Sequence, residues 1–178
     1  MLKKILIALF LIVVAFVVVV ALQRSEFRVA RSIVVAAPAA AVFRQVNDFH
    51  NWVNWSPWEK RDPAMKRVYE GATAGTGAVY RWDGSKEVGA GSMTIIESRP
   101  SDLVRIKLEF LKPFRATNTA EFTFKPEGDR TAVMWSMTGH NNFMAKAVHL
   151  FINIDKMIGD DFERGLAQIK QVAEARGK

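Results

Sequence analysis

Three aspartates toward the C-terminal end are the residues best suited to acid–base chemistry. The stretch DKMIGDDFERG carries Asp155, Asp160 and Asp161. Paired carboxylates act as acid and base when an apolar wall raises the pKa of one of them. The same side chains also suit helix capping and pairing with basic neighbours, and their positions in a charged helical stretch favour this second interpretation. We therefore predict that none of the three is catalytic.

Other signatures of catalysis or metal binding are missing from the sequence. His50, His140 and His149 occur singly, without the i, i+4 pairs typical of a metal site. Ser92 follows a glycine in GAGSM but lacks the strand-to-helix context of a nucleophile elbow. The chain has no cysteine, which excludes disulfides and thiolate ligands. We expect no catalytic residue, no metal and no cofactor.

Three of the five tryptophans fall within DFHNWVNWSPWEKRDP. Trp52, Trp55 and Trp58 are spaced by three, which places them along one side of a short helix. Pro57 and Pro63 limit that helix to one or two turns. Three interpretations stay open: packing that closes one end of the core, a portal lined by aromatic rings for an apolar ligand, or contact with the bilayer interface.

The N-terminal segment is apolar enough to cross a membrane. From Ile5 to Leu22 there is no charge, proline or glycine, and these 18 residues form a helix of about 27 Å. We predict an uncleaved anchor in residues 1–24 and a domain in residues 25–178. A cleaved signal peptide is the alternative, although its apolar core is usually about 7–15 residues long. Only Gln23 to Phe27 precede the first strand, so the domain is expected to lie against the bilayer.

The basic residues beside the apolar segment bear on its orientation in the membrane, and the net charge of the chain bears on a nucleic-acid partner. Lys3 and Lys4 favour keeping the amino end inside, although Arg24, Arg28 and Arg31 weaken the argument. We expect a single-pass protein of a bacterial-type inner (plasma) membrane, with its domain on the outer, periplasmic side. The net charge is +7. Without Lys3, Lys4 and Arg24, 22 basic residues face 18 acidic ones with no basic run, so no nucleic-acid partner is expected.

The rest of the chain predicts a sheet and a long helix. Residues 27–37 are rich in β-branched side chains, and alanines after Pro38 favour a short helix. Between Lys66 and Gly139, segments such as LVRIKLEF alternate apolar and charged residues, which indicates antiparallel strands. Asn142 to Ala175 lacks proline and predicts one long helix, in which Gly165 suggests a close approach to the sheet. Its apolar stripe comprises Phe151, Ile154, Ile158, Phe162, Gly165, Ile169 and Val172.

Several segments together resemble a known superfamily. They are IVVAAPAAAVFRQVNDFHNWVNWSPW, GTGAVYRWDG, GAGSMTI, TAVMWSMTG and DDFERGLAQIK. Over residues 27–175 the chain is similar to START-like (SRPBCC) proteins, which group polyketide cyclases and dehydrases with Bet v 1-like proteins. The resemblance implies an α+β helix-grip fold, with an antiparallel sheet of about seven strands wrapped around a long C-terminal helix. In that superfamily an apolar cavity between sheet and helix holds lipids, hormones or polyketides.

These observations predict a membrane-anchored, non-enzymatic binding module for an apolar or lipid-like small molecule. Its partners would be that ligand and the bilayer crossed by residues 5–22. A cyclase- or dehydrase-like enzyme and a structural domain with a packed interior are the alternatives, since fold alone does not decide activity. The predicted ligand-binding residues are Trp52, Trp55, Trp58, Tyr80, Trp82, Phe110, Phe122, Trp135, Met137, Ile154 and Ile158.

Overall fold

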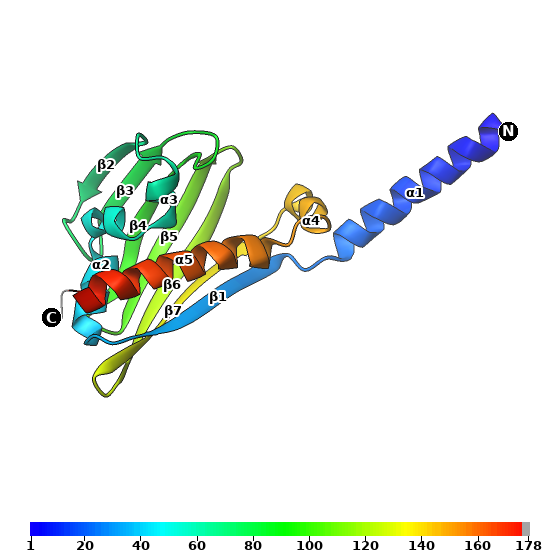
Figure 1. The fold of residues 1–178 in the computed structure, drawn as a ribbon. Coiled ribbons are helices and arrows are strands. Elements are labelled where there is room, and N and C mark those ends of the chain that lie inside the picture. The colour runs from blue at the N-terminus through cyan, green and yellow to red at the C-terminus, as the bar shows by residue number, and fades with distance from the viewer. Residues whose placement is uncertain (176–178) are drawn as a thin grey trace.

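The computed structural model describes residues 1–175, which form a projecting helix and a domain whose helices cover one face of a sheet (Figure 1). The helices are α1 (Leu2–Leu22), α2 (Ala39–Asn47), the 3-10 helix η1 (Phe49–Asn54), α3 (Pro57–Arg61), α4 (Phe143–His149) and α5 (Ile154–Ala175). The strands are β1 (Glu26–Val35), β2 (Lys66–Gly71), β3 (Ala78–Asp83), β4 (Ala90–Arg99), β5 (Leu103–Lys112), β6 (Ala116–Glu127) and β7 (Arg130–His140). This is the predicted α+β helix-grip architecture.

The seven strands form one antiparallel sheet in the order β1-β7-β6-β5-β4-β3-β2. Strands β2 to β7 follow one another as neighbours, and β1 pairs with the last strand. The alternation expected for β5 is confirmed, because Val104 and Ile106 are fully buried while Lys107, the next residue along, is exposed. One face of the sheet therefore packs on helices and the other faces outward.

The long helix α5 lies across the inner face of the sheet (Figure 1). Phe162, Leu166 and Ile169 are buried at the spacing of three and four expected for one face of a helix. A β carbon on Gly165 would lie only 2.7 Å from Cζ3 of Trp135. The predicted close approach is confirmed, and the absence of a side chain at Gly165 lets α5 pack directly on the Trp135 ring.

The prediction of one helix from Asn142 to Ala175 is wrong. Two helices form, α4 and α5, because two asparagines start them separately. The Asn142 side chain accepts a hydrogen bond from Ala145 N at 2.9 Å, and Asn153 accepts one from Lys156 N at 2.9 Å. Phe151 lies between the two helices with 81% of its surface exposed, so it does not belong to the buried stripe.

Three elements lie toward the same end of the sheet: α1, α4 and the turn between β5 and β6 (Figure 1). Only Gln23 to Ser25 separate α1 from β1. The carbonyl oxygen of Ser25 accepts a hydrogen bond from Asn141 N at 2.6 Å, just before α4. Val20 of α1 is fully buried, and α1 contacts α4. The last turn of α1 is thus held to the domain through its linker and through α4.

Candidate functional site

Two of the three clustered tryptophans are core residues. Trp52 belongs to η1 and Trp55 follows it, and the period of three in a 3-10 helix aligns them. They are 4% and 0% exposed, with ring centroids 4.5 Å apart. Their indole nitrogens donate to the carbonyl oxygens of Val46 at 3.0 Å and Gln45 at 2.9 Å. Hydrogen bonding of both indoles fixes this segment against α2.

A stack of three aromatic rings joins α5 to the sheet. Trp135 of β7 lies parallel to Phe162 of α5, with centroids 4.0 Å apart and planes 9° apart. Phe122 of the neighbouring strand β6 also stacks on Trp135, with ring centroids 4.6 Å apart. Trp55 contacts both Phe122 and Trp135 edge-on. This half of the interior, beneath the middle of α5, is packed with aromatic rings.

The Trp135 indole nitrogen is an exception within this packed region. Trp135 is 2% exposed, and its Nε1 has no hydrogen-bond partner among residues 1–175. A buried N–H without an acceptor is costly, and such a group is ordinarily satisfied by water or by a ligand atom. The interior therefore contains one donor able to bind an oxygen acceptor.

The interior is less completely packed toward the α1 end of the sheet. Phe110 of β5 and Ile158 of α5 are half-buried there. Trp82 of β3 is also half-buried and meets Phe110 edge-on, at a centroid distance of 5.9 Å. Half-buried apolar side chains are therefore contributed by the sheet and by the start of α5 toward this end of the grip.

The predicted ligand-binding residues consequently divide into groups. The buried ones are Trp52, Trp55, Tyr80, Phe122, Trp135 and Met137. The half-buried ones are Trp58, Trp82, Phe110, Ile154 and Ile158. Ile154 lines a different space, a pocket of about 480 Å³ between the start of β1 and the junction of α4 and α5. That pocket contains none of the tryptophans.

A buried polar cluster that was not predicted from the sequence lies on the inner side of β2 and β3. Glu59 of α3 is 5% exposed. One of its oxygens accepts a hydrogen bond from the Tyr80 hydroxyl at 2.6 Å, and the other accepts one from Arg67 Nε at 2.7 Å. Tyr69 packs beside Tyr80, and His50 stacks on Tyr69. The cluster ties α3 to the edge of the sheet.

The environment of this cluster shifts several ionisation equilibria. Burial, followed by the hydrogen bond to Glu59, raises the pKa of Tyr80 far above its ordinary value. Burial and the charge of Glu59 also raise the pKa of Tyr69. The hydrogen bond to Glu59 raises the pKa of Arg67. Both tyrosines therefore remain protonated, and Tyr80 remains a donor to Glu59.

An alkaline titration is expected to show this directly, because Tyr69 and Tyr80 are the only two tyrosines in the chain. Unfolded tyrosine loses its proton at a pKa of about 10, whereas Tyr80 keeps it when folded. The contribution of Tyr80 to the free energy of unfolding should thus stay constant below about pH 10 and should be lost progressively as the pH rises above it. Tyrosinate absorbance should appear together with loss of circular dichroism. Ionisation of both tyrosines near pH 10 in a protein that is still folded would contradict the structure.

The three aspartates each pair with basic side chains. Asp161 is 6% exposed and accepts hydrogen bonds from Arg61 of α3 and Arg164. Asp160 pairs with Lys156 at 2.7 Å, which lowers the pKa of its carboxyl. Asp155 pairs with Arg31 of β1 at 3.0 Å. Arg31 and Arg61 therefore fasten α5 to β1 and to α3, and the three carboxylates point to separate partners.

The histidines also have separate environments. His50 contacts Asp48 at 2.8 Å, and His149 lies 3.2 Å from the Asn141 amide. Burial lowers the pKa of His149. Within residues 1–175, no group of three or more histidine and carboxylate side chains is arranged to hold a metal ion.

The geometry defines the class of protein: a helix-grip domain with an aromatic interior that is densely packed in one half. The family model for polyketide cyclase/dehydrase and lipid transport proteins matches residues 26–174. The chain therefore belongs to that family. The match covers every strand and almost all of α5.

Solved structures share the fold at low sequence identity. The Zhui aromatase/cyclase from Streptomyces sp. R1128 is 15% identical, with a TM-score of 0.64 over 86% of this chain and 96% of that one. A solution structure from Thermobifida fusca is 24% identical, with a TM-score of 0.60 over 82% and 92%. The di-domain ARO/CYC StfQ of the steffimycin pathway is 14% identical, with a TM-score of 0.62 over 86% of this chain and 52% of that one. No curated protein matches the sequence.

Proposed function

We propose that the protein is a membrane-anchored binding module that takes an apolar ligand between the sheet and α5. The observation that carries this proposal is the uneven packing of the interior. Aromatic rings, Trp58 among them, pack closely around Trp135, whereas Trp82, Phe110 and Ile158 are half-buried toward the end nearest α1. Apolar side chains that converge from several elements without being fully covered are typical of ligand sites.

The chemistry of the interior narrows the ligand class. The inner surface of this region is largely apolar, with Asn118 as a polar side chain on it, so it suits an acyl chain or a fused ring system. The buried and unpaired Trp135 Nε1, among the described residues, supports a ligand that carries an oxygen acceptor. Each buried methylene contributes about 0.8 kcal/mol, so eight of them give roughly 6 kcal/mol before ordering costs. A fatty acid or a similar amphiphile meets both requirements.

The membrane part of the proposal rests on α1. It is the one helix within residues 1–175 that is long and apolar enough to cross a membrane, and almost all of it is exposed. A signal sequence near the N-terminus has the same properties. The contact of α1 with α4 favours a retained anchor, because cleavage would remove that contact. With Lys3 and Lys4 inside, the domain lies on the outer side of an inner (plasma) membrane.

Blocking the half-buried region tests binding. We expect Leu108→Trp to weaken binding of a fluorescent fatty acid by about tenfold or more, because the larger ring occupies the inner face beside Met93 and Asn118. Lys107→Trp is the matched control: it makes the same change one residue away on the outer face and should leave affinity unaltered. Titration of full-length protein in detergent micelles measures both, with circular dichroism to confirm folding.

The same titration decides between the proposal and a packed structural domain. Equal affinities for the two variants would place the ligand elsewhere. A wild-type protein that binds no apolar probe and carries no extractable apolar molecule in native mass spectrometry would refute the proposed binding of an apolar ligand between the sheet and α5.

The polar cluster supports a second candidate, an acid–base enzyme of the cyclase or dehydrase type. Glu59 and Tyr80 form a buried carboxylate–hydroxyl pair inside the grip, the kind of arrangement that transfers protons. Against it, both Glu59 oxygens already have partners in Tyr80 and Arg67. Glu59→Gln separates the two functions: an enzyme loses turnover, whereas a binding module keeps its affinity for the fatty-acid probe.

A further inference from the structure

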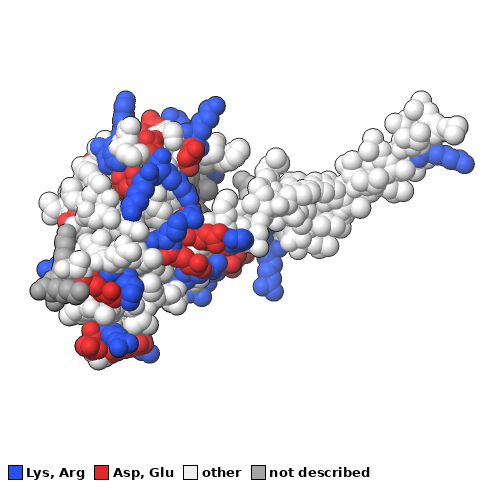
Figure 2. Space-filling view, viewed as in Figure 1, with Lys and Arg blue, Asp and Glu red and all other residues white. Residues whose placement is uncertain are grey.

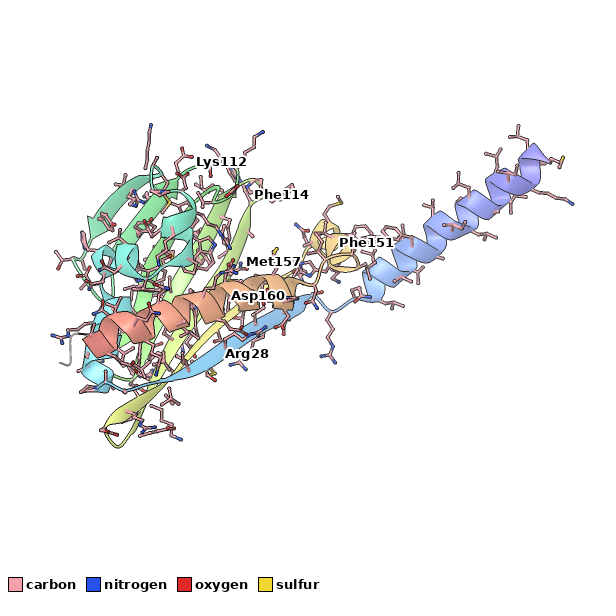
Figure 3. The ribbon with its side chains drawn as sticks, in the orientation of Figure 1. Arg28, Lys112, Phe114, Phe151, Met157 and Asp160 are labelled. Atoms are coloured by element: carbon pink, nitrogen blue, oxygen red, sulfur yellow. The ribbon has the colours of Figure 1, made fainter. Side chains whose placement is uncertain are left out.

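The end of the domain nearest α1 exposes a concentration of large apolar side chains. We call it the α4 surface; it comprises Phe114, Phe143, Met144, Val148, Leu150, Phe151 and Ile152. Phe114 and Phe151 are both 81% exposed, and Met144 is 70% exposed. Figure 3 shows Phe114 and Phe151 on the side of the domain that faces α1. Exposure of several large apolar side chains at one end of a domain is typical of a surface that another apolar medium covers.

The domain core does not account for the apolar residues of α4. In the described chain, α4 contains no buried residue, although Phe143, Met144 and Val148 make it strongly apolar. Its helical neighbour is α1, whose Val20 is fully buried. The helix α4 therefore lies beside the last turn of the segment that crosses the bilayer in the proposed function. An apolar helix in this position is level with the membrane boundary.

The charges around the α4 surface suit an anionic membrane. From Asn141 to Ile154 the sequence has no acidic residue, while Lys146 is basic. Lys112 and Arg115 flank Phe114 on the β5–β6 turn. In Figure 2 the uncharged surface of α1 continues onto the adjoining end of the domain. Apolar side chains bordered by cations are the pattern of segments that lie in the interface of anionic bilayers.

We propose that the α4 surface is inserted into the headgroup–acyl boundary of the bilayer that α1 crosses. This inference rests on the proposed function, because it requires α1 to be in a membrane. The end of the grip with half-buried side chains would then open next to lipid, and an amphiphile could pass between bilayer and interior without crossing bulk water.

The chain has no cysteine, so a single introduced cysteine can carry a spin label. Four full-length variants are reconstituted in vesicles of phosphatidylcholine and phosphatidylglycerol: Phe151→Cys and Phe114→Cys on the α4 surface, Ile12→Cys in α1, and Val34→Cys. Val34 lies near the other end of β1 and is 43% exposed, which makes it the matched apolar control. The measurement is the relaxation of each label by oxygen, which enters lipid, and by a water-soluble nickel chelate.

Labels at Phe151 and Phe114 are expected to show an oxygen-to-nickel ratio several-fold above that at Val34, and the label at Ile12 the highest ratio. If the Ile12 label is in lipid while Phe151 and Phe114 match Val34, the anchor stands and the insertion is refuted. Low access of both reagents to Phe151 and Phe114 would mean that a protein partner covers the surface, which also refutes it. An Ile12 label in water would overturn the anchor and this inference together.

Discussion

The Trp135→Ala variant is expected to lose about 3–5 kcal/mol of folding free energy, because truncation of a buried aromatic side chain leaves a cavity that the surroundings fill only partly. Trp135 is 2% exposed and stacks on Phe162 and Phe122. Its ring also packs against α5 at Gly165, where a β carbon would lie only 2.7 Å from Cζ3. The loss would therefore loosen the attachment of α5 as well as the core.

Thermal unfolding of the full-length protein in detergent measures this effect, and a fall in Tm of about 10 °C or more is expected for a domain of this size. Trp135→Phe is the matched control, since it keeps an aromatic ring and removes the unpaired N–H. It should lose much less stability yet weaken binding of the fatty-acid probe if Nε1 holds the ligand oxygen. A Trp135→Ala protein with an unchanged Tm would show that the stack is not formed.

Glu59→Ala is expected to destabilise the domain by a similar amount, about 3–5 kcal/mol, because it leaves the half-buried Arg67 without its counter-charge and the buried Tyr80 hydroxyl without its acceptor. The side chain of Arg67 is 23% exposed, so water can only partly replace the carboxylate. The Tyr80 hydroxyl, buried on the inner face, would lose its acceptor as well. Detachment of α3 from β2 and β3 is the expected structural result, visible as a lower Tm and faster proteolysis near Pro57.

Two further variants make this result interpretable. Glu59→Gln keeps an oxygen acceptor and the same shape, so its Tm should lie between those of Glu59→Ala and the wild type. Asp160→Asn removes an exposed carboxylate paired only with Lys156 in the described contacts, and changes at such positions are usually within about 0.5 kcal/mol. If Glu59→Ala and Asp160→Asn proved equally mild, the buried cluster would not support α3.

The sheet was predictable because its signal is local. In β5 the period of two assigns Val104 and Ile106 to the buried face without reference to any other strand. Gly165 was also informative: glycine is unfavourable within a helix, so a tight contact was the natural explanation. The Trp135 ring, at 2.7 Å from the position of a β carbon, is that contact.

The α4–α5 boundary was harder to predict, because an apolar stripe continues through it. Phe151 and Ile154 have helical spacing, yet Phe151 is 81% exposed while Ile154 is half-buried. The signal that would have separated the helices is Asn153, whose side chain caps α5. Exposed apolar residues with helical spacing therefore give the same sequence pattern as a buried stripe.

The polar cluster was unpredictable for a different reason. Ser56-Pro57-Trp58-Glu59 matches a capping box, in which the glutamate would bend back to the helix start. In the structure Glu59 points to Tyr80 and Arg67 instead, and the Ser56 side chain makes no capping bond. The two partners of Glu59 belong to strands that come later in the chain, so only folding brings the three side chains together. The same holds for the tryptophans, whose burial depends on Phe122 and Trp135.

The linker from Gln23 to Ser25 limits how far the domain can move away from α1. Three residues extend about 10 Å at most, and Ser25 is bonded to Asn141. With α1 in a bilayer, the domain therefore cannot swing out to a distant acceptor or travel as a shuttle does. It moves only sideways with its anchor, in two dimensions. Under the proposed function, any ligand that leaves other than into the same bilayer would have to be collected by a component that comes within contact distance of the domain.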